Sequence, residues 1–202
     1  GLAFTLANAI TYIEEALKRG LPVDSFARSF TTFLGSGIDL LEEVAKFRAM
    51  RKLWARLLRE RYGAKDPDSL RIPIRAYTCG SNLTRQQPLN NVVRTTLEAA
   101  AAVLGGVQLL VVSSLDEAFA IPSEEHQTVA LRTQQILYHE SGLPRTADPL
   151  GGSYFLESLT KEMEARVLKV LDAVEALGGA PRAMECGFIQ TEIASSAYEQ
   201  QL

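Results

Sequence analysis

The densest group of polar side chains that could do chemistry follows a short apolar run. Residues 107–112 are almost wholly apolar, and Ser113, Ser114, Asp116 and Glu117 come directly after them. Hydroxyls and carboxylates there could bind the hydroxyl groups of a ligand, and Glu117 could also act as a general base. An acidic pair is equally typical of a helix N-terminus, where the macrodipole favours negative charge. The residues alone leave both interpretations open.

Other residues that could form a catalytic or binding site are weaker candidates. His126 and His139 are the only histidines, and neither has a second histidine or a cysteine at metal-ligand spacing. We interpret His126 as a surface residue and His139 as a cation favoured near a helix end. There is no Gly-x-Ser-x-Gly turn. The glycines at 35–37 and 151–152 match neither dinucleotide nor P-loop spacing, so we expect plain turns.

Composition narrows the class of protein. The chain has 202 residues, 47% of them hydrophobic, and a formal net charge of -3, which provides no broad basic field for nucleic acid or an anionic membrane. The apolar stretch 99–112 is too short to span a bilayer, and no signal peptide is recognisable. Cys79 and Cys186 have no redox or metal spacing, which favours free thiols and a cytoplasmic protein. The start without methionine suggests a fragment or a processed chain.

Predicted strands and helices alternate along the chain. Three segments have the β-branched and aromatic density or the apolar character of strands, and each ends in a polar loop. Apolar residues at helical spacing mark the helices between and after them. The expected strands are 23–34, 70–78 and 107–112, with exits at 35–37, 79–82 and 113–117; the expected helices are 3–19, 39–62, 84–104, 128–138, 157–177 and 190–201. We interpret the basic residues of helix 39–62 as a solvated face.

This alternation predicts an α/β fold with right-handed βαβ crossovers. An open doubly wound sheet and part of an eight-stranded barrel both satisfy it, and the three polar exits favour the barrel slightly. The carboxyl ends of parallel strands meet at one edge, so we expect the exits to line the site. Arg75 and Tyr77 alternate within one strand and must share a face, interior or exterior.

Three stretches carry a family resemblance. Residues 83–108, "LTRQQPLNNVVRTTLEAAAAVLGGVQ", 114–125, "SLDEAFAIPSEE", and 148–160, "DPLGGSYFLESLT", resemble the barrel domain of the methylmalonyl-CoA mutase family of cobalamin-dependent enzymes, over nearly all of residues 3–180. The resemblance implies the C-terminal part of a TIM (β/α)8 barrel with about three parallel strands and their helices. Residues 1–158 would be the acyl-CoA-binding barrel portion, and 159–202 a helical extension and the start of a linker.

The resemblance also implies an activity. In that family the barrel encloses an acyl-CoA, and a separate domain presents the corrin of adenosylcobalamin, whose deoxyadenosyl radical starts a carbon-skeleton rearrangement; such an enzyme is an isomerase. The implied partners are the acyl-CoA substrate, the remaining barrel with the corrin-binding domain, and a second mutase chain. Methylmalonyl-CoA, isobutyryl-CoA and related thioesters stay open as substrates.

On the cofactor side, Glu117 matches the family glutamate that contacts the deoxyadenosyl ribose. A carboxylate accepts hydrogen bonds from vicinal hydroxyls well, so the chemistry agrees with the resemblance. Ser113 stands where the family usually has asparagine, and Tyr77 where it usually has glutamine. These three residues are the expected cofactor contacts.

On the substrate side, Arg75 stands at a usual histidine position. Ser29 falls where a family arginine meets the CoA phosphates, and neighbouring Arg28 could serve instead. With Thr31, these are the expected substrate contacts. The family's catalytic Tyr-His pair is expected upstream of Gly1, so no catalytic residue is assigned, and no protein metal ligand is expected.

Several polar family positions have changed, and Leu109 and Val111 are apolar replacements. The chain could therefore belong to a mutase with another acyl-CoA, or to the non-catalytic small subunit of a heterodimeric mutase. A metabolite-binding or scaffold α/β domain is a third reading. The retained Glu117 and the 148–157 motif favour an active mutase chain.

Overall fold

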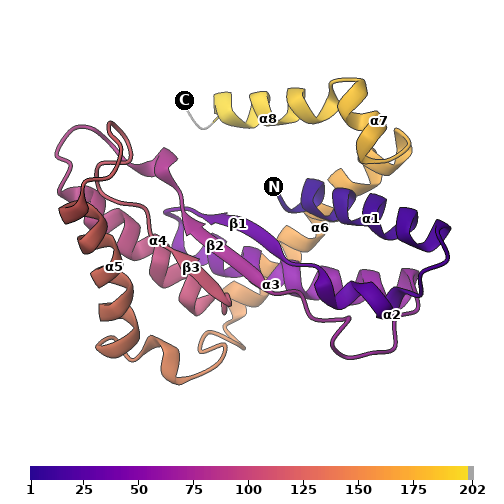
Figure 1. Cartoon of the computed structure of the whole chain (residues 1–202), viewed down its shortest axis with the longest axis horizontal. Coiled ribbons are helices and arrows are strands. Elements are labelled where there is room, and N and C mark those ends of the chain that lie inside the picture. The colour runs from indigo at the N-terminus through magenta and orange to yellow at the C-terminus, as the bar shows by residue number, and fades with distance from the viewer. Residues whose placement is uncertain (200–202) are drawn as a thin grey trace.

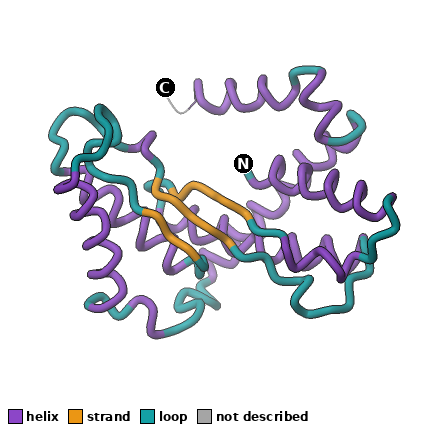
Figure 2. The backbone as a smooth tube through the Cα atoms, viewed as in Figure 1, coloured by secondary structure: helices purple, strands orange, loops and turns teal. Residues whose placement is uncertain are grey.

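The computed structural model describes residues 1–199 and has a mixed α/β fold. Its single sheet has three parallel strands in the order β1-β2-β3, namely β1 (Thr32–Ser36), β2 (Ile74–Thr78) and β3 (Leu109–Val111). The strands lie side by side at the centre of the molecule, with helices between them along the chain (Figures 1 and 2). The predicted α/β class and parallel strands are confirmed, and neighbouring strands joined by helical crossovers are what part of a (β/α)8 barrel requires.

Eight α-helices surround or extend this sheet within the described residues. They are α1 (Leu2–Lys18), α2 (Val23–Phe26), α3 (Leu40–Arg56), α4 (Asn90–Leu104), α5 (Glu124–His139), α6 (Tyr154–Ala176), α7 (Ala180–Glu185) and α8 (Phe188–Glu199). A π-helical turn, Leu57–Arg61, continues α3, and 3-10 turns occupy Ala27–Ser29, Gly80–Asn82 and Leu143–Arg145. Helix α6 crosses both α3 and α1, while α8 stands apart at the C-terminal end (Figure 1).

One face of the sheet is covered by helices. Leu34, Ile74 and Ala76 are buried there and share a core cluster with Phe47 and Trp54 of α3. Alternate strand residues therefore point into an apolar layer, which supplies the main driving force for docking α3 and α4 on the sheet.

The opposite face has no helix over it among residues 1–199 (Figure 1). The register aligns Phe33, Arg75 and Leu109 in one row and Gly35, Tyr77 and Val111 in the next. These side chains are exposed, except at half-buried Gly35, and the Phe33 and Tyr77 rings stack with centroids 5.2 Å apart. Because barrel helices lie outside, Arg75 and Tyr77 are on the face that would line a barrel interior.

The first strand is much shorter than predicted. Residues 23–26 form α2 and residues 27–29 a 3-10 turn, so the prediction of a strand over 23–34 was wrong except at its end. Pro22 precedes the first helical residue, and the Asp24 carboxylate accepts hydrogen bonds from the backbone of Lys65 and Asp66, which fixes this segment to another loop. Two of the phenylalanines that suggested a strand, Phe26 and Phe30, pack instead against each other, and Phe30 also packs against Trp54.

Other boundaries differ by six residues or fewer. Strand β2 begins only after Pro73, which has no N–H to donate, and α4 begins after Pro88 rather than at residue 84. Helix α5 begins at Glu124 because Ser123 caps it, and α7 was not predicted. The last two residues of the predicted helix 190–201 lie outside the described residues. No helix within 1–199 is long and apolar enough to cross a membrane.

The proposed division at residues 158/159 falls inside α6, which packs on α3 and α1. A continuous helix therefore joins the expected barrel portion to the expected extension. The division stays a prediction.

Candidate functional site

The three strand exits meet at one edge of the sheet, as the sequence predicted. The Ser113 backbone N–H donates to Thr78 Oγ1 over 2.8 Å, and Ser113 Oγ donates to the Thr78 carbonyl over 2.9 Å. A Cβ added at Gly35 would collide with Cys79 Sγ, so the first two exits are also in close contact. Polar groups from separate parts of the chain thus form one candidate site.

The loop after β3 is held by Asp116. This carboxylate is buried and accepts hydrogen bonds from Ser114 Oγ and from the Ser123 backbone N–H, the latter over 3.0 Å, while His126 Nδ1 lies 2.8 Å away. Burial alone would raise the pKa of Asp116, but the hydrogen bonds from Ser114 and His126 hold it well below its usual range. Asp116 is therefore a fixed anion that ties the loop to the start of α5.

Two sequence interpretations are corrected here. Asp116 and Glu117 do not begin a helix, because they lie in turns and α5 starts at Glu124. His126 is half-buried and bound to Asp116 rather than a plain surface residue. Within residues 1–199, no group of three His, Cys, Asp or Glu side chains could hold a metal ion.

Glu117 is exposed and its carboxylate lies against Gly80, in the exit of β2. A Cβ built on Gly80 would be 3.1 Å from Glu117 Cδ and would collide with Oε1. The absence of a side chain at Gly80 therefore makes the space that the carboxylate occupies. As an exposed carboxylate, Glu117 can accept hydrogen bonds from a ligand at this position.

The sequence analysis missed Glu98, a fully buried residue of α4 behind the same turn. Its Oε1 accepts a hydrogen bond from Asn82 Nδ2 over 2.7 Å, and its carbonyl accepts one from Ser36 Oγ over 2.7 Å. Burial raises the pKa of the Glu98 carboxyl to about 7, although the hydrogen bond from Asn82 acts in the opposite direction. One pattern could have revealed it: Asn91, Thr95, Glu98 and Ala102 are all buried and recur at helical spacing.

The surroundings of this turn are acidic. Glu43 and Glu117 both raise the pKa of Glu98 further, and Lys46 pairs with Glu43 while donating to the Gly35 carbonyl over 2.8 Å. Burial also raises the pKa of the Cys79 thiol, which Lys46 opposes. Cys79 and Cys186 are free thiols, as predicted.

The expected substrate residues lie at the other end of the sheet. Arg28 and Ser29 are exposed in the 3-10 turn before β1, and exposed Thr31 donates to the Pro73 carbonyl over 3.0 Å. The six residue steps from Thr31 to Gly37 in extended chain would separate the two ends by roughly 20 Å. The structure therefore does not bring Arg28, Ser29 and Thr31 to Glu117, and Arg75 and Tyr77 lie between the two groups.

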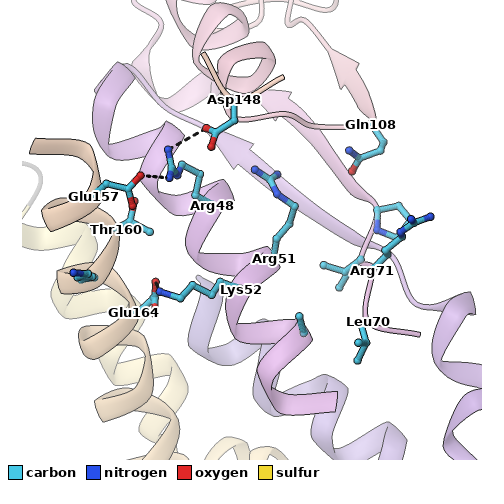
Figure 3. Close-up of a pocket in the computed structure, with 14 residues that line it drawn as sticks. Arg48, Arg51, Lys52, Leu70, Arg71, Gln108, Asp148, Glu157, Thr160 and Glu164 are labelled. Atoms are coloured by element: carbon cyan, nitrogen blue, oxygen red, sulfur yellow. Dashed lines mark hydrogen bonds and ion pairs between the residues drawn. The ribbon is translucent and has the colours of Figure 1, made fainter. Parts of the chain in front are cut away.

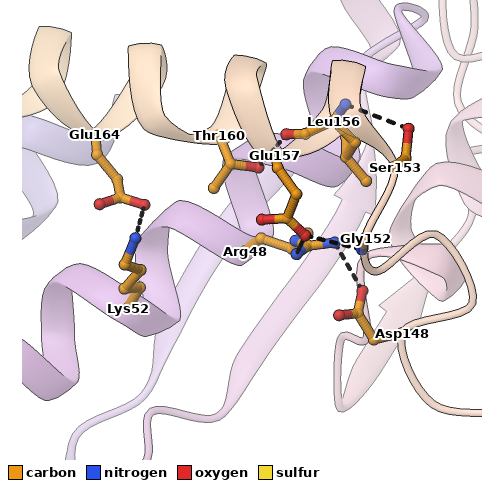
Figure 4. Close-up of polar contacts among 9 residues, drawn as sticks. All are labelled: Arg48, Lys52, Asp148, Gly152, Ser153, Leu156, Glu157, Thr160 and Glu164. Carbon is orange, nitrogen blue, oxygen red and sulfur yellow. Dashed lines mark hydrogen bonds and ion pairs between the residues drawn. The ribbon is translucent and has the colours of Figure 1, made fainter.

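A pocket of about 640 Å³ lies on the helix side near the amino ends of β2 and β3 (Figure 3). Arg48 bonds to Asp148 over 3.0 Å and to Glu157 over 2.5 Å, and Lys52 bonds to Glu164 over 2.8 Å (Figure 4). The predicted solvated face of α3 is therefore wrong for Arg48, whose side chain is 14% exposed, whereas the Lys52 side chain is 58% exposed, as predicted. Arg48 and Lys52 are occupied in fixing α6 and its preceding loop to α3, so we assign these contacts a structural role.

The same contacts explain the 148–157 motif. The Gly152 N–H donates to Glu157 Oε1 over 3.1 Å, and Ser153 Oγ accepts from the Leu156 N–H at the start of α6 (Figure 4). The hydrogen bond from the Gly152 N–H, together with that from Arg48, lowers the pKa of Glu157. The motif is thus a loop and helix cap folded around one arginine.

A parallel sheet with helices on one face, mainly apolar side chains on the other, and polar strand exits at one edge defines part of a barrel-type α/β domain. The sequence model of the family described as Methylmalonyl-CoA mutase matches residues 1–202. The chain belongs to this family.

Three relatives illustrate the likeness. The chain is 49% identical over 200 residues to the 2-hydroxyisobutanoyl-CoA mutase large subunit of Aquincola tertiaricarbonis, covering 99% of this chain and 36% of that one. It is 43% identical over 202 residues to the methylmalonyl-CoA mutase of Escherichia coli K12, covering 100% and 28%. Identity to the mitochondrial methylmalonyl-CoA mutase of Homo sapiens is 40% over 200 residues, covering 99% and 27%. The chain therefore spans about a quarter to a third of these relatives.

Proposed function

We propose that this chain forms the C-terminal part of the acyl-CoA barrel in an adenosylcobalamin-dependent mutase, an isomerase that rearranges the carbon skeleton of a CoA thioester. The observation that carries the proposal is the exposed Glu117 carboxylate over Gly80, at the edge where all three strands end. Family membership supports the same reaction class. The rest of the barrel and a corrin-binding domain are then partners of this chain, on the same or another polypeptide.

The residues at this edge fit the adenosyl part of the cofactor. Glu117 can accept hydrogen bonds from both hydroxyls of a ribose. Ser113 Oγ already donates to the Thr78 carbonyl, so it retains acceptor capacity for a further hydroxyl. Any side chain at Gly80 would displace Glu117, which makes this glycine part of the fit.

Adenosylcobalamin, when bound, supplies the radical that starts the rearrangement. The chain's own contribution is to bind, orient and exclude water. Phe33, Tyr77, Leu109 and Val111 give the inner face a largely apolar surface, and Arg75 adds one positive charge to it. Arg28, Ser29 and Thr31 lie at the opposite end, which suits the phosphate end of an extended CoA thioester.

The test uses the full-length protein with adenosylcobalamin and a panel of acyl-CoA thioesters, including methylmalonyl-, isobutyryl- and 2-hydroxyisobutyryl-CoA. Cob(II)alamin absorbance and product formation are followed together. We expect one thioester to give both signals, and Glu117→Ala to reduce turnover well beyond any loss of stability. Full activity in the Glu117→Ala variant would contradict the assignment.

A second candidate is the non-catalytic subunit of a heterodimeric mutase. The apolar Leu109 and Val111 on the inner face favour it, because a subunit that binds no substrate has no need of polar groups there. If no thioester gives cob(II)alamin or product, and the protein forms a tight complex with a second mutase chain, this alternative is established.

A separate corrin subunit is a related possibility. The matched stretch makes up 36% of the relative named as a large subunit and 28% of the Escherichia coli mutase, so that large subunit is the shorter chain. Because this chain has the higher identity to that large subunit, we infer that its full-length protein is also a shorter chain, with the corrin-binding domain on a separate subunit. Adding a purified corrin-binding subunit would then be required for activity.

A further inference from the structure

Glu98 has an arrangement that packing does not explain. Its side chain is fully buried, one carboxyl oxygen accepts from Asn82 Nδ2, and the other, Oε2, has no hydrogen-bond partner among residues 1–199. A buried polar atom without a partner costs free energy that an apolar residue would avoid. Its neighbours Ala99, Ala101 and Ala102 show that α4 can bury small apolar side chains at the adjacent positions.

The contacts of Glu98 join two strand exits. Its backbone carbonyl holds Ser36 at the end of β1, and its carboxyl holds Asn82 in the exit of β2. Asn82 closes a short turn in which its N–H donates to the Cys79 carbonyl over 3.2 Å, while the Leu83 N–H donates to the Gly80 carbonyl over 3.0 Å. Gly80 lies inside this turn, so its position depends on where Asn82 is held.

Gly80 in turn supports Glu117. A Cβ built on Gly80 would collide with Glu117 Oε1, so the carboxylate lies directly against this glycine. A chain of direct contacts therefore runs from Glu98 through Asn82 and Gly80 to Glu117. The electrostatics agree, because Glu43 and Glu117 disfavour a second charge at Glu98 and burial favours its neutral form.

We propose that Glu98 is a positioning residue for Glu117: by holding Asn82 it fixes the Gly80 turn, and through that turn the carboxylate that receives the ribose of adenosylcobalamin. This inference rests on the proposed function, since it takes Glu117 as the ribose contact. Glu98 itself is covered by the turn and would not touch the cofactor.

The test measures adenosylcobalamin affinity of the full-length protein by absorbance titration, with KM for the preferred acyl-CoA as a second readout. Glu98→Ala and Asn82→Ala should each weaken adenosylcobalamin binding about fivefold to tenfold, as for loss of one ordered hydrogen bond. The acyl-CoA KM should change less than about twofold. Glu98→Gln keeps an acceptor for Asn82 and should bind within about twofold of the parent.

Glu164→Gln is the matched control, because Glu164 is also a buried helical carboxylate, paired with Lys52, but it lies on α6. It should leave cofactor affinity unchanged. If Glu98→Ala does not fold, Asn82→Ala decides, since Asn82 is only half-buried. Parent-like affinity in Asn82→Ala, with weakened affinity in Glu117→Ala, overturns the positioning role alone. Parent-like affinity in Glu117→Ala overturns the ribose contact and this inference with it.

Discussion

Glu98→Gln should change the pH dependence of local stability in a direction fixed by the structure. The pKa of Glu98 rises from its ordinary 4.5 to about 7 in the fold. Between these values the folded state holds more protons than the unfolded state, so stability falls as pH rises from about 4.5 to about 7 and levels off above. Glutamine does not titrate, so the variant lacks this fall.

The magnitude follows from the shift. At about 1.4 kcal/mol per pKa unit, the upper limit is about 3 kcal/mol, and we expect about 1–2 kcal/mol because relaxation and water access weaken burial effects. The free energy of opening of α4 in Glu98→Gln, minus that of the parent, should therefore rise by this amount between pH 5 and pH 8. The groups facing Glu98 are Asn82, Cys79, Glu43 and Glu117. Taking the difference between variant and parent cancels any titration of these groups that the substitution leaves unchanged.

Hydrogen exchange of peptides from residues 90–104, followed by mass spectrometry, measures this opening without interference from other parts of the protein. Glu162→Gln is the control, because it removes one carboxylate from an exposed pair with Arg166. A constant offset between Glu98→Gln and parent is expected from the unpaired amide group. A difference that stays flat from pH 5 to pH 8 would refute the neutral, buried carboxyl.

Three further substitutions test the remaining contacts. Arg48→Met removes the partner of two carboxylates and should destabilise the protein by about 1–2 kcal/mol, since those carboxylates are partly exposed; thermal unfolding and proteolysis of the preceding loop check it. Asp116→Asn should speed hydrogen exchange across residues 113–123 and weaken adenosylcobalamin binding, and the parent loop should loosen only as pH falls below about 4, because a lowered pKa stabilises above the unfolded value. Gly80→Ala should displace Glu117 and weaken cofactor binding more than about tenfold; unchanged affinity would mean the carboxylate can move at no cost.

The sequence predicted those parts of the fold whose signals are local. Asp39 caps α3 through the Glu42 N–H, as expected for an aspartate before an apolar helix. The polar exits also fell where parallel strands end, because strand direction and helical crossovers fix that geometry. The prediction of a strand over residues 23–34 was wrong because aromatic side chains suit a helix–loop core and a strand equally well.

The candidate site was predicted only in part, for a similar reason. Glu117 stands out in the sequence because it follows an apolar strand. Glu98 lies inside an alanine-rich helix, where no strand end or loop marks it as a candidate. Its importance depends on which face of α4 meets the sheet, and that depends on tertiary packing. His126 was likewise misread, because its partner Asp116 is ten residues away in a loop whose path the sequence does not specify.

The distribution of polarity across the sheet connects these observations. Behind the sheet, where an apolar layer is usual, Ser36, Thr78 and Glu98 are buried. Ser36 donates a hydrogen bond to the Glu98 carbonyl, Thr78 accepts one from Ser113, and the Glu98 carboxyl accepts one from Asn82. In front, on the face that would line a barrel, Phe33 and Leu109 are exposed and apolar. Buried hydrogen bonds fix geometry more tightly than apolar contacts, because each leaves an unpaired group when it breaks.

Two independent sets of contacts fix the position of Glu117. Its own loop is fixed by Asp116, and the turn beneath it is fixed by Glu98 through Asn82. A single exposed carboxylate on a mobile loop would lose much of its binding energy in becoming ordered. Two separate buried carboxyl groups that hold the loop and the turn before any ligand arrives remove most of that cost, which is the physical reason to expect a binding residue at Glu117 rather than a solvent-exposed charge.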